Sequence, residues 1–222
     1  MSNNYITLIV EDSGLIVRGI KILLKEITES KDATFEIHYA TKYSKALSIL
    51  KDEPYINLVF LDVKLPKEPE VEMFSGEDLG VEIRLLHPSA LILVIIAPNN
   101  PVLIHRIMEK FAPDGLFVKG DIKLEEFTFA ISKALTKPPY YSSTALKYIV
   151  NGKYNKLILT KRDEHLLILL DKGLTLEQIG AEILISKSAV AKRKKRLKEL
   201  LGVEDGNDRD LVNSAREIGL IE

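Results

Sequence analysis

Short, continuous apolar runs alternate with amphipathic stretches between residues 5 and 135. The apolar runs are YITLIV (5–10), FEIHYA (35–40), INLVFL (56–61), LILVII (91–96) and GLFV (115–118). Because strands covered on both faces read as unbroken apolar segments, these runs predict parallel strands. The stretches between them repeat apolar residues at helical spacing. Five strand–helix units predict an α/β fold with a five-stranded, parallel, doubly wound sheet.

The pattern changes at TKPPYYSS (136–143), whose prolines and serines predict a linker followed by a helix N-cap at Ser142 or Ser143. Beyond residue 159, helical periodicity predicts helices over 161–171, 175–183, 186–201 and 208–218. Residues 151–159 fit neither pattern. We therefore predict three parts, which are a sheet domain over 1–136, a linker with a short helix over 137–158, and a small all-α domain over 159–222.

Composition agrees with two soluble domains. The chain has 222 residues and a net charge of -1, but residues 1–143 carry 16 basic and 20 acidic residues, and residues 144–222 carry 15 and 12. An acidic front and a basic back predict two different tasks. The absence of cysteine excludes disulfides and thiolate metal sites. The N-terminus lacks signal-peptide features and the longest apolar run is ALILVIIA (90–97), so we expect a cytoplasmic protein without membrane spans.

Charged residues follow three of the predicted strands. Glu11 and Asp12 come after the first strand, Asp62 after the third and Lys119 after the fifth. Because ligands of parallel sheets bind beyond the carboxyl ends of the strands, we expect these side chains to converge. Clustered carboxylates repel one another unless a cation lies among them, and Mg²⁺ suits oxygen ligands shared with a phosphate. Asp62 could then act as a nucleophile that forms an acyl phosphate, with Lys119 binding a phosphoryl oxygen.

Other interpretations of these acids are weaker. A single Asp at a strand end is more often a helix cap, but three acids and a lysine at neighbouring ends favour a site. A dinucleotide site would need a glycine-rich loop, which EDSGLIV lacks. A phosphatase of the haloacid dehalogenase type would need a second Asp where this chain has Lys64.

Residues 5–135 resemble the receiver domain of bacterial two-component response regulators, on the segments LIVEDSGLIVRG, LDVKLP and DGLFVKGD. The resemblance implies a flavodoxin-like fold with Asp62 as phosphoacceptor for a partner histidine kinase. It implies Mg²⁺ bound by Asp12, Asp62 and the backbone carbonyl of Lys64, with Glu11 acting mostly through water and Lys119 binding the phosphoryl group. The domain would catalyse only its own phosphoryl transfer and dephosphorylation, so we do not expect a separate enzyme.

The chain departs from this family at three places. Ala97 stands where the family usually has Thr or Ser, and Leu116 stands where it usually has a switch aromatic, while Phe117 is one position off. The loop after the phosphoacceptor strand is longer than usual, and its acidic part at 67–75 contains Glu68, Glu70 and Glu72. This loop is either a solvated surface loop or a contact for a partner beside Asp62.

A basic helix is predicted at 186–201, where six of the seven residues from Lys192 to Lys198 are basic. At 100° per residue, Val190, Leu197 and Leu201 form an apolar stripe. The opposite side of the helix and its edges carry the candidate DNA-binding residues, which are Lys187, Ser188, Lys192, Arg193, Lys194, Lys195 and Arg196. We expect Lys192 and Lys195 to face bases and Arg193, Lys194 and Arg196 to bind phosphates. Ser186 is placed to cap this helix.

The segment from Leu159 to Val203 resembles the LuxR/NarL-type helix-turn-helix output domain without a gap. Together, the two resemblances imply a transcriptional response regulator that binds double-stranded promoter DNA as a homodimer when a kinase phosphorylates Asp62. The alternative is a DNA-binding regulator whose atypical receiver responds to a ligand or a protein rather than to phosphorylation. Ala97 and Leu116 favour the alternative, whereas the intact acids and Lys119 oppose it.

Overall fold

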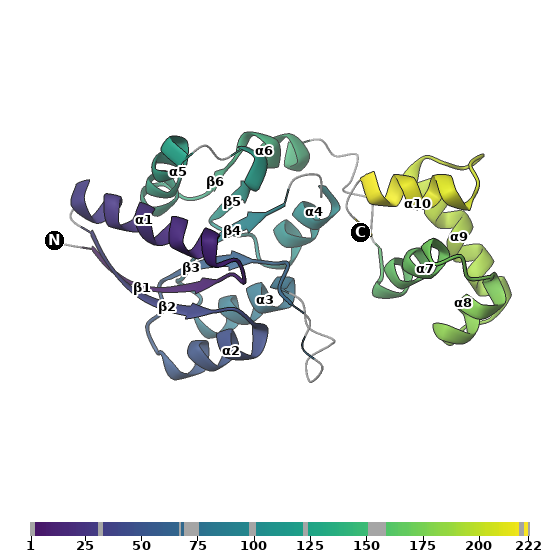
Figure 1. Ribbon diagram of the computed structural model, residues 1–222, viewed down its shortest axis with the longest axis horizontal. Coiled ribbons are helices and arrows are strands. Elements are labelled where there is room, and N and C mark those ends of the chain that lie inside the picture. Colours follow the sequence, from purple (N-terminus) through teal and green to yellow (C-terminus); the bar gives the residue numbers. More distant parts are fainter. Residues whose placement is uncertain are drawn as a thin grey trace. The chain divides into compact units, whose positions relative to one another are not determined.

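Six parallel strands form one sheet in this computed structural model, in the order β2-β1-β3-β4-β5-β6 (Figure 1). The strands are β1 (Asn3–Val10), β2 (Ala33–Ala40), β3 (Leu58–Asp62), β4 (Leu91–Ile96), β5 (Gly115–Val118) and β6 (Tyr140–Tyr141). The structure describes residues 3–30, 33–66, 68, 76–97, 101–121, 124–150, 159–217 and 220–221. Every residue of β3 and β5 is buried, as expected for strands covered on both faces.

The parallel α/β sheet is confirmed, but the predicted count of five strands is wrong. Tyr140 and Tyr141 add a sixth strand beside β5. The N–H of Tyr140 donates to the carbonyl of Asp114 at 2.9 Å, and the N–H of Ser142 donates to the carbonyl of Leu116 at 2.9 Å. Two residues are too few to show a periodicity, and the prolines before them indicate a linker. The strand forms because the open edge of β5 offers backbone groups that need partners.

Helices cover both faces of this sheet. Figure 1 shows α1 and α5 on one face and α2 and α3 on the other. Ile20 of α1 and Ile131 of α5 pack with Phe60 of β3 in a buried apolar core. The helices of this part are α1 (Gly14–Ser30), α2 (Tyr43–Asp52), α3 (Gly76–Leu86), α4 (Pro101–Lys110), α5 (Leu124–Thr136) and α6 (Ser143–Val150).

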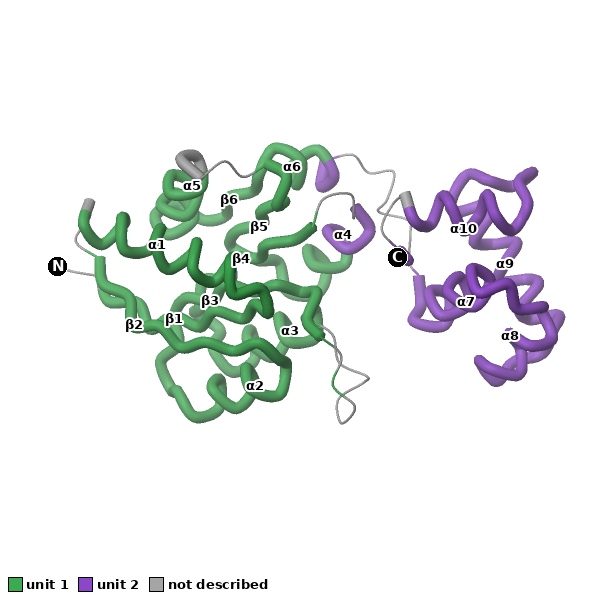
Figure 2. Tube along the Cα trace, viewed as in Figure 1, with its two compact units in different colours: residues 1–98, 106–147 green, residues 99–105, 148–222 purple. Residues whose placement is uncertain are grey.

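The chain divides into two compact units, residues 1–98 with 106–147 and residues 99–105 with 148–222 (Figure 2). The domain boundaries expected from the sequence stay a prediction, and the linker segment 151–158 lies outside the described residues. Among the described helices, none is both long and apolar enough to span a membrane.

Four helices make up most of the second unit: α7 (Lys161–Asp171), α8 (Leu176–Glu182), α9 (Lys187–Leu201) and α10 (Asp208–Glu217). Thr160, Thr175 and Ser186 cap the starts of α7, α8 and α9 by accepting a backbone N–H three residues later. Gly202, in the left-handed conformation with φ 68°, ends α9. Val190 and Leu197 of α9 are fully buried against the other helices, as the predicted stripe requires.

Gly76 sets the approach of α3 to the end of β3. A Cβ atom at Gly76 would lie 2.3 Å from the Cα atom of Val63, which directly follows Asp62. Backbone cannot move aside as a flexible side chain can, so we expect Gly76→Ala to lower the free energy of unfolding by about 1–3 kcal/mol. Urea unfolding followed by circular dichroism measures the change.

Gly19→Ala in α1 is the matched control, because a Cβ there would meet no atom within 4 Å. This substitution should leave stability unchanged or raise it by up to about 1 kcal/mol, since Ala favours helix more than Gly. Equal destabilisation by both substitutions would contradict the close approach of Gly76 to Val63.

Candidate functional site

The predicted acids and lysine meet at one rim of the sheet. β1 lies between β2 and β3, so the strand order reverses direction beside β1, where open α/β sheets bind ligands. Glu11 and Asp12 follow β1, Asp62 ends β3 and Lys119 follows β5. One carboxylate oxygen from each of the three acids lies within 4.8 Å of the others. The structure therefore brings together the four side chains that the sequence placed on separate strands.

Lys119 joins two of these acids. Its Nζ lies 2.8 Å from Oδ2 of Asp62 and 3.6 Å from Oε2 of Glu11. Glu11 and Asp62 are buried, whereas Asp12 is exposed. The backbone N–H of Lys64 donates to Oδ1 of Asp62 at 2.7 Å, so both oxygens of this carboxylate are held. The site thus offers two buried carboxylates, of which Asp62 is bonded at both oxygens, and one exposed carboxylate beside them.

The charges of the cluster are unbalanced toward the negative. Burial raises the pKa of Glu11 to about 7; the N–H of Ser13 at 2.9 Å opposes this rise, as does Lys119, and the charge of Asp62 adds to it. Burial lowers the pKa of Lys119, but its pairs with Asp62 and Glu11 outweigh burial and hold that pKa above its usual range. Glu11 thus lies buried between Asp62, whose charge raises its pKa, and Lys119, whose charge lowers it.

The donor set suits a hard divalent cation. Carboxylate oxygens are the ligands that Mg²⁺ prefers, and the cluster needs positive charge. A cleft of about 440 Å³ gives access to Asp12 and Asp62, and Lys64, Pro66, Ala97 and Lys119 also line it. The residues fit a cation and leave room for a phosphoryl group, although Mg²⁺ itself stays a prediction.

The two atypical switch positions lie in different environments. Ala97 is exposed and lines the cleft with a methyl group, which cannot donate a hydrogen bond. Leu116 is fully buried. Phe117 is buried on the α1–α5 face, with its ring 5.4 Å from Phe127 and 5.9 Å from Tyr140 between centroids. Ala97 therefore lacks the hydroxyl, and Leu116 lacks the aromatic ring, that the family usually has at these two positions.

Within the inserted loop at 67–75, the structure describes Glu68, which is bonded to Ser44 of α2. Oε2 of Glu68 accepts the N–H of Ser44 at 3.0 Å, and Oε1 accepts the hydroxyl of Ser44 at 2.6 Å. These bonds lower the pKa of Glu68 and satisfy the first turn of α2, whose own N-cap residue makes no side-chain cap. Glu70 and Glu72 lie outside the described residues.

The basic residues of α9 fall into two groups. Lys192 and Lys195 are exposed, as expected for a surface that meets a partner. Ser188 is exposed at the helix start, with its Oγ 3.0 Å from Oγ of Ser186. Lys187 is exposed as well, but it belongs with the second group, because it pairs with Glu177 of α8.

The second group is paired within the second unit. Arg193 NH1 lies 2.7 Å from Oδ1 of Asp163, and Arg196 NH1 lies 3.7 Å from Oδ2 of the same acid. Lys194 Nζ lies 2.9 Å from Oδ1 of Asp208. The helical periodicity of α9 gives the side of the helix on which each of these cations lies. It does not show their acidic partners, which come from α7 and α10.

No protein-family model matches the sequence, and no curated protein matches it. Solved structures do match. RcsB of Salmonella enterica serovar Typhimurium bound to promoter P1flhDC with the phosphomimetic BeF3- is 18% identical, covers 98% of this chain and 100% of its own, and has a TM-score of 0.66. The same protein bound to promoter rprA with BeF3- is 23% identical, with coverage of 96% and 98% and a TM-score of 0.63. A structure of two RcsB dimers bound to two parallel DNAs is 19% identical, with coverage of 97% and 100% and a TM-score of 0.63.

The chain has the fold of RcsB response regulators. The likeness extends over nearly all of both chains, so it includes the sheet and the helices of the second unit. At these identities the likeness concerns the fold, and the chemistry must be argued from the residues.

Sequence reasoning missed Asp163, which organises the start of α7. Asp163 is buried, and its Oδ2 accepts the N–H of Thr160 at 2.9 Å and the hydroxyl at 2.7 Å. Burial disfavours its charge, yet the bonds from Thr160 and the pair with Arg193 hold its pKa below the usual range. The spacing Thr160-x-x-Asp163 is a capping-box pattern and is the one signal that could have identified this acid.

Sequence reasoning also missed a pair beside Lys119. Asp121 accepts two hydrogen bonds from Thr144 at the start of α6. Burial disfavours its charge, but the bonds from Thr144 and Ser142 lower its pKa below the usual range. No sequence spacing indicates a contact between residues 23 positions apart.

Proposed function

We propose that this protein is a DNA-binding transcriptional response regulator. A partner histidine kinase transfers a phosphoryl group to Asp62, and the helix-turn-helix formed by α8 and α9 binds promoter DNA. The observation that carries the proposal is the convergence of Glu11, Asp12, Asp62 and Lys119 at one rim of the sheet, in a chain with the RcsB fold.

Each residue of the rim would have its own role in phosphoryl transfer. An oxygen of Asp62 attacks phosphorus, so a P–O bond forms as the P–N bond of the phosphohistidine breaks. The N–H of Lys64 fixes the carboxylate for this attack. Lys119, 2.8 Å from Asp62, binds an oxygen of the new phosphoryl group and neutralises part of its charge. Asp12, Asp62 and the Lys64 carbonyl would hold Mg²⁺, with Glu11 acting through water.

When bound, Mg²⁺ supplies positive charge that offsets repulsion between the phosphoryl oxygens and the acids. The domain performs this transfer and then hydrolyses the acyl phosphate, in a step in which water attacks phosphorus, the P–O bond to Asp62 breaks and inorganic phosphate leaves. We propose no separate enzymatic activity. A protein without the Asp62 carboxylate should take up no phosphoryl group, which makes labelling the direct test of this part of the proposal.

The second unit would provide the output. RcsB is bound to promoter DNA in two of the matched structures, and in a third two RcsB dimers are bound to two parallel DNAs. By this likeness we propose that α9 enters the major groove and that two copies bind paired half-sites in the cytoplasm. Lys192 and Lys195, exposed on α9, are the best candidates for base contacts. Arg193 and Lys194, which are partly exposed, and Arg196, which is exposed, flank these two lysines, and DNA phosphates would pass beside them.

Removing Lys192 or Lys195 should weaken DNA binding. We expect Lys192→Ala and Lys195→Ala each to lower affinity roughly tenfold or more, because one good base contact contributes about 1–3 kcal/mol. Affinity is measured by fluorescence anisotropy with a duplex selected from random sequence by the full-length protein, at several salt concentrations. Loss of a base contact changes the discrimination between duplexes, whereas loss of a phosphate contact reduces the magnitude of the salt slope by about 0.9.

Lys25→Ala on exposed α1 removes the same charge and should leave affinity unchanged. If all three variants bind DNA as the unaltered protein does, α9 is not the DNA-binding helix.

The alternative function is a DNA-binding regulator that responds to a ligand or a protein. The observations that favour it are the exposed methyl group of Ala97 and the complete burial of Leu116, which remove the usual switch side chains. The two functions differ in one result. Only regulation by phosphorylation requires that a phosphoryl mimic at Asp62 change the DNA binding of the second unit.

A further inference from the structure

The segment that carries Lys119 is hydrogen-bonded to the start of α6. Lys119, Gly120 and Asp121 form the short 3-10 helix η2 (Lys119–Asp121) directly after β5. Oδ2 of Asp121 accepts the N–H of Thr144 at 2.8 Å, and Oδ1 accepts the Thr144 hydroxyl at 2.6 Å. The carboxylate thus satisfies the first turn of α6, where backbone N–H groups lack partners within the helix. A negative charge is also favourable at this end of a helix.

A second set of bonds holds the residues on the other side of Lys119. The N–H of Val118 donates to the Oγ of Ser142 at 3.2 Å, and the N–H of Ser142 donates to the carbonyl of Leu116 at 2.9 Å. Ser142 is buried and directly precedes α6. Residues on both sides of Lys119 are therefore bonded to the segment 142–144.

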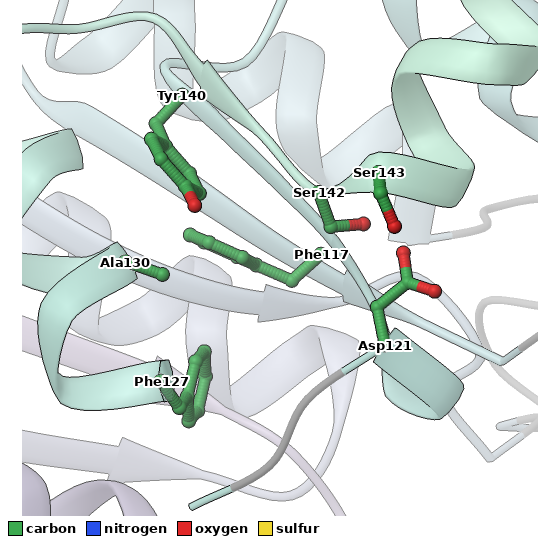
Figure 3. Close-up of a pocket in the computed structure, with 7 residues that line it drawn as sticks. All are labelled: Phe117, Asp121, Phe127, Ala130, Tyr140, Ser142 and Ser143. Atoms are coloured by element: carbon green, nitrogen blue, oxygen red, sulfur yellow. The ribbon is translucent and has the colours of Figure 1, made fainter. Parts of the chain in front are cut away.

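We call these bonds between η2, the end of β5 and the segment 142–144 the joint, and a cavity lies beside it. The cavity has a volume of about 150 Å³, and Figure 3 shows the rings of Phe117, Phe127 and Tyr140 on one side and Asp121 with Ser142 on the other. Close-packed interiors resist displacement of their side chains. Asp121 and Ser142 line this space, so a shift of either into it meets fewer close-packed atoms.

We propose that Asp121 and Thr144 couple the state of Asp62 to α6, in place of the side-chain relay that Ala97 and Leu116 cannot provide. The inference rests on the proposed function, because it needs a phosphoryl group at Asp62. That group draws Nζ of Lys119 from its present position, 2.8 Å from Asp62 Oδ2, toward a phosphoryl oxygen. The backbone of η2 follows, and the Asp121–Thr144 bonds change with it.

The result is a change in the stability of the first turn of α6, from which the chain continues into the second unit. Coupling of this kind is reciprocal. Because the bonds between Asp121 and Thr144 carry this coupling, weakening them must reduce the effect of Asp62 on α6 and, equally, the effect of α6 on Asp62.

The test is hydrogen exchange of the α6 amides in the full-length protein, with Mg²⁺ and with or without BeF3-. In the unaltered protein, BeF3- should change the exchange rates of residues 144–147 roughly tenfold, the equivalent of one hydrogen bond of about 1.4 kcal/mol. Thr144→Val removes the hydroxyl bond and Asp121→Ala removes both bonds. We expect the BeF3- response to fall in the first variant and to shrink below about twofold in the second.

Thr128→Val is the matched control, because its hydroxyl bonds to Glu26 at 3.0 Å between α5 and α1 and takes no part in the bonds between η2 and α6. It should keep the full response. Binding of BeF3-, followed by its fluorine resonance, should be present in all four proteins. A response in α6 that is absent from the unaltered protein, or equal in all four proteins, overturns the inference alone. Failure of the unaltered protein to bind BeF3- overturns the proposed phosphorylation and the inference together.

Discussion

Asp62→Asn is expected to abolish labelling of this protein by a radioactive phosphoryl donor in the presence of Mg²⁺. Asp62 is the buried carboxylate whose oxygens are held by Lys119 at 2.8 Å and by the N–H of Lys64 at 2.7 Å. An amide cannot form the acyl phosphate, so the loss should be complete rather than partial. In the unaltered protein the label should be released by hydroxylamine, which cleaves acyl phosphates and leaves phosphoserine intact.

Two further variants separate the chemistry from folding. Asp52→Asn changes an exposed acid at the end of α2 and should label normally. Lys119→Ala should label less and should also weaken the response to BeF3-, because the developing charge loses its ammonium partner. Labelling of the Asp62→Asn protein equal to that of the unaltered protein would refute Asp62 as the phosphoacceptor.

The rim could be predicted from sequence because parallel strands end at a common edge. Each of Glu11, Asp12, Asp62 and Lys119 follows a continuous apolar run, and the strand ends are fixed by where that run stops. The order of the strands in the sheet then brings these strand ends next to one another. No knowledge of side-chain contacts was needed to bring residues 11 and 119 together.

Contacts across elements could not be predicted in this way. The helical wheel gives the angle of Arg193 on α9 but cannot show that Asp163, on α7, lies 2.7 Å away. The sixth strand was missed for a related reason: Tyr140 and Tyr141 are extended because β5 lies beside them, not because of their own pattern. The coupling of Asp121 to Thr144 depends on that strand, since β6 places the start of α6 beside η2.

Asp163→Asn is expected to destabilise the second unit by about 2 kcal/mol, because it removes a buried, hydrogen-bonded carboxylate that pairs with a partly exposed guanidinium group. Asp163 is 1% exposed and pairs with Arg193 while it accepts two bonds from Thr160. Asparagine can keep a bond from Thr160 but cannot balance the guanidinium groups of Arg193 and Arg196. Native-state hydrogen exchange of α7 and α9 in the full-length protein measures this loss for the second unit itself.

The effect of Asp163 should depend on pH with a definite sign. Its pKa in the folded protein is held below the usual range, so its stabilisation is fully present above the pKa of an unfolded Asp, about 3.9. Stabilisation is lost as pH falls through the folded pKa, and the difference between the two proteins should shrink there. Asp171→Asn removes a partly exposed pair with Arg216 and should cost about 1 kcal/mol or less. A pH-independent difference, or equal losses at Asp163 and Asp171, would show that the buried charge of Asp163 does not hold α7 against α9.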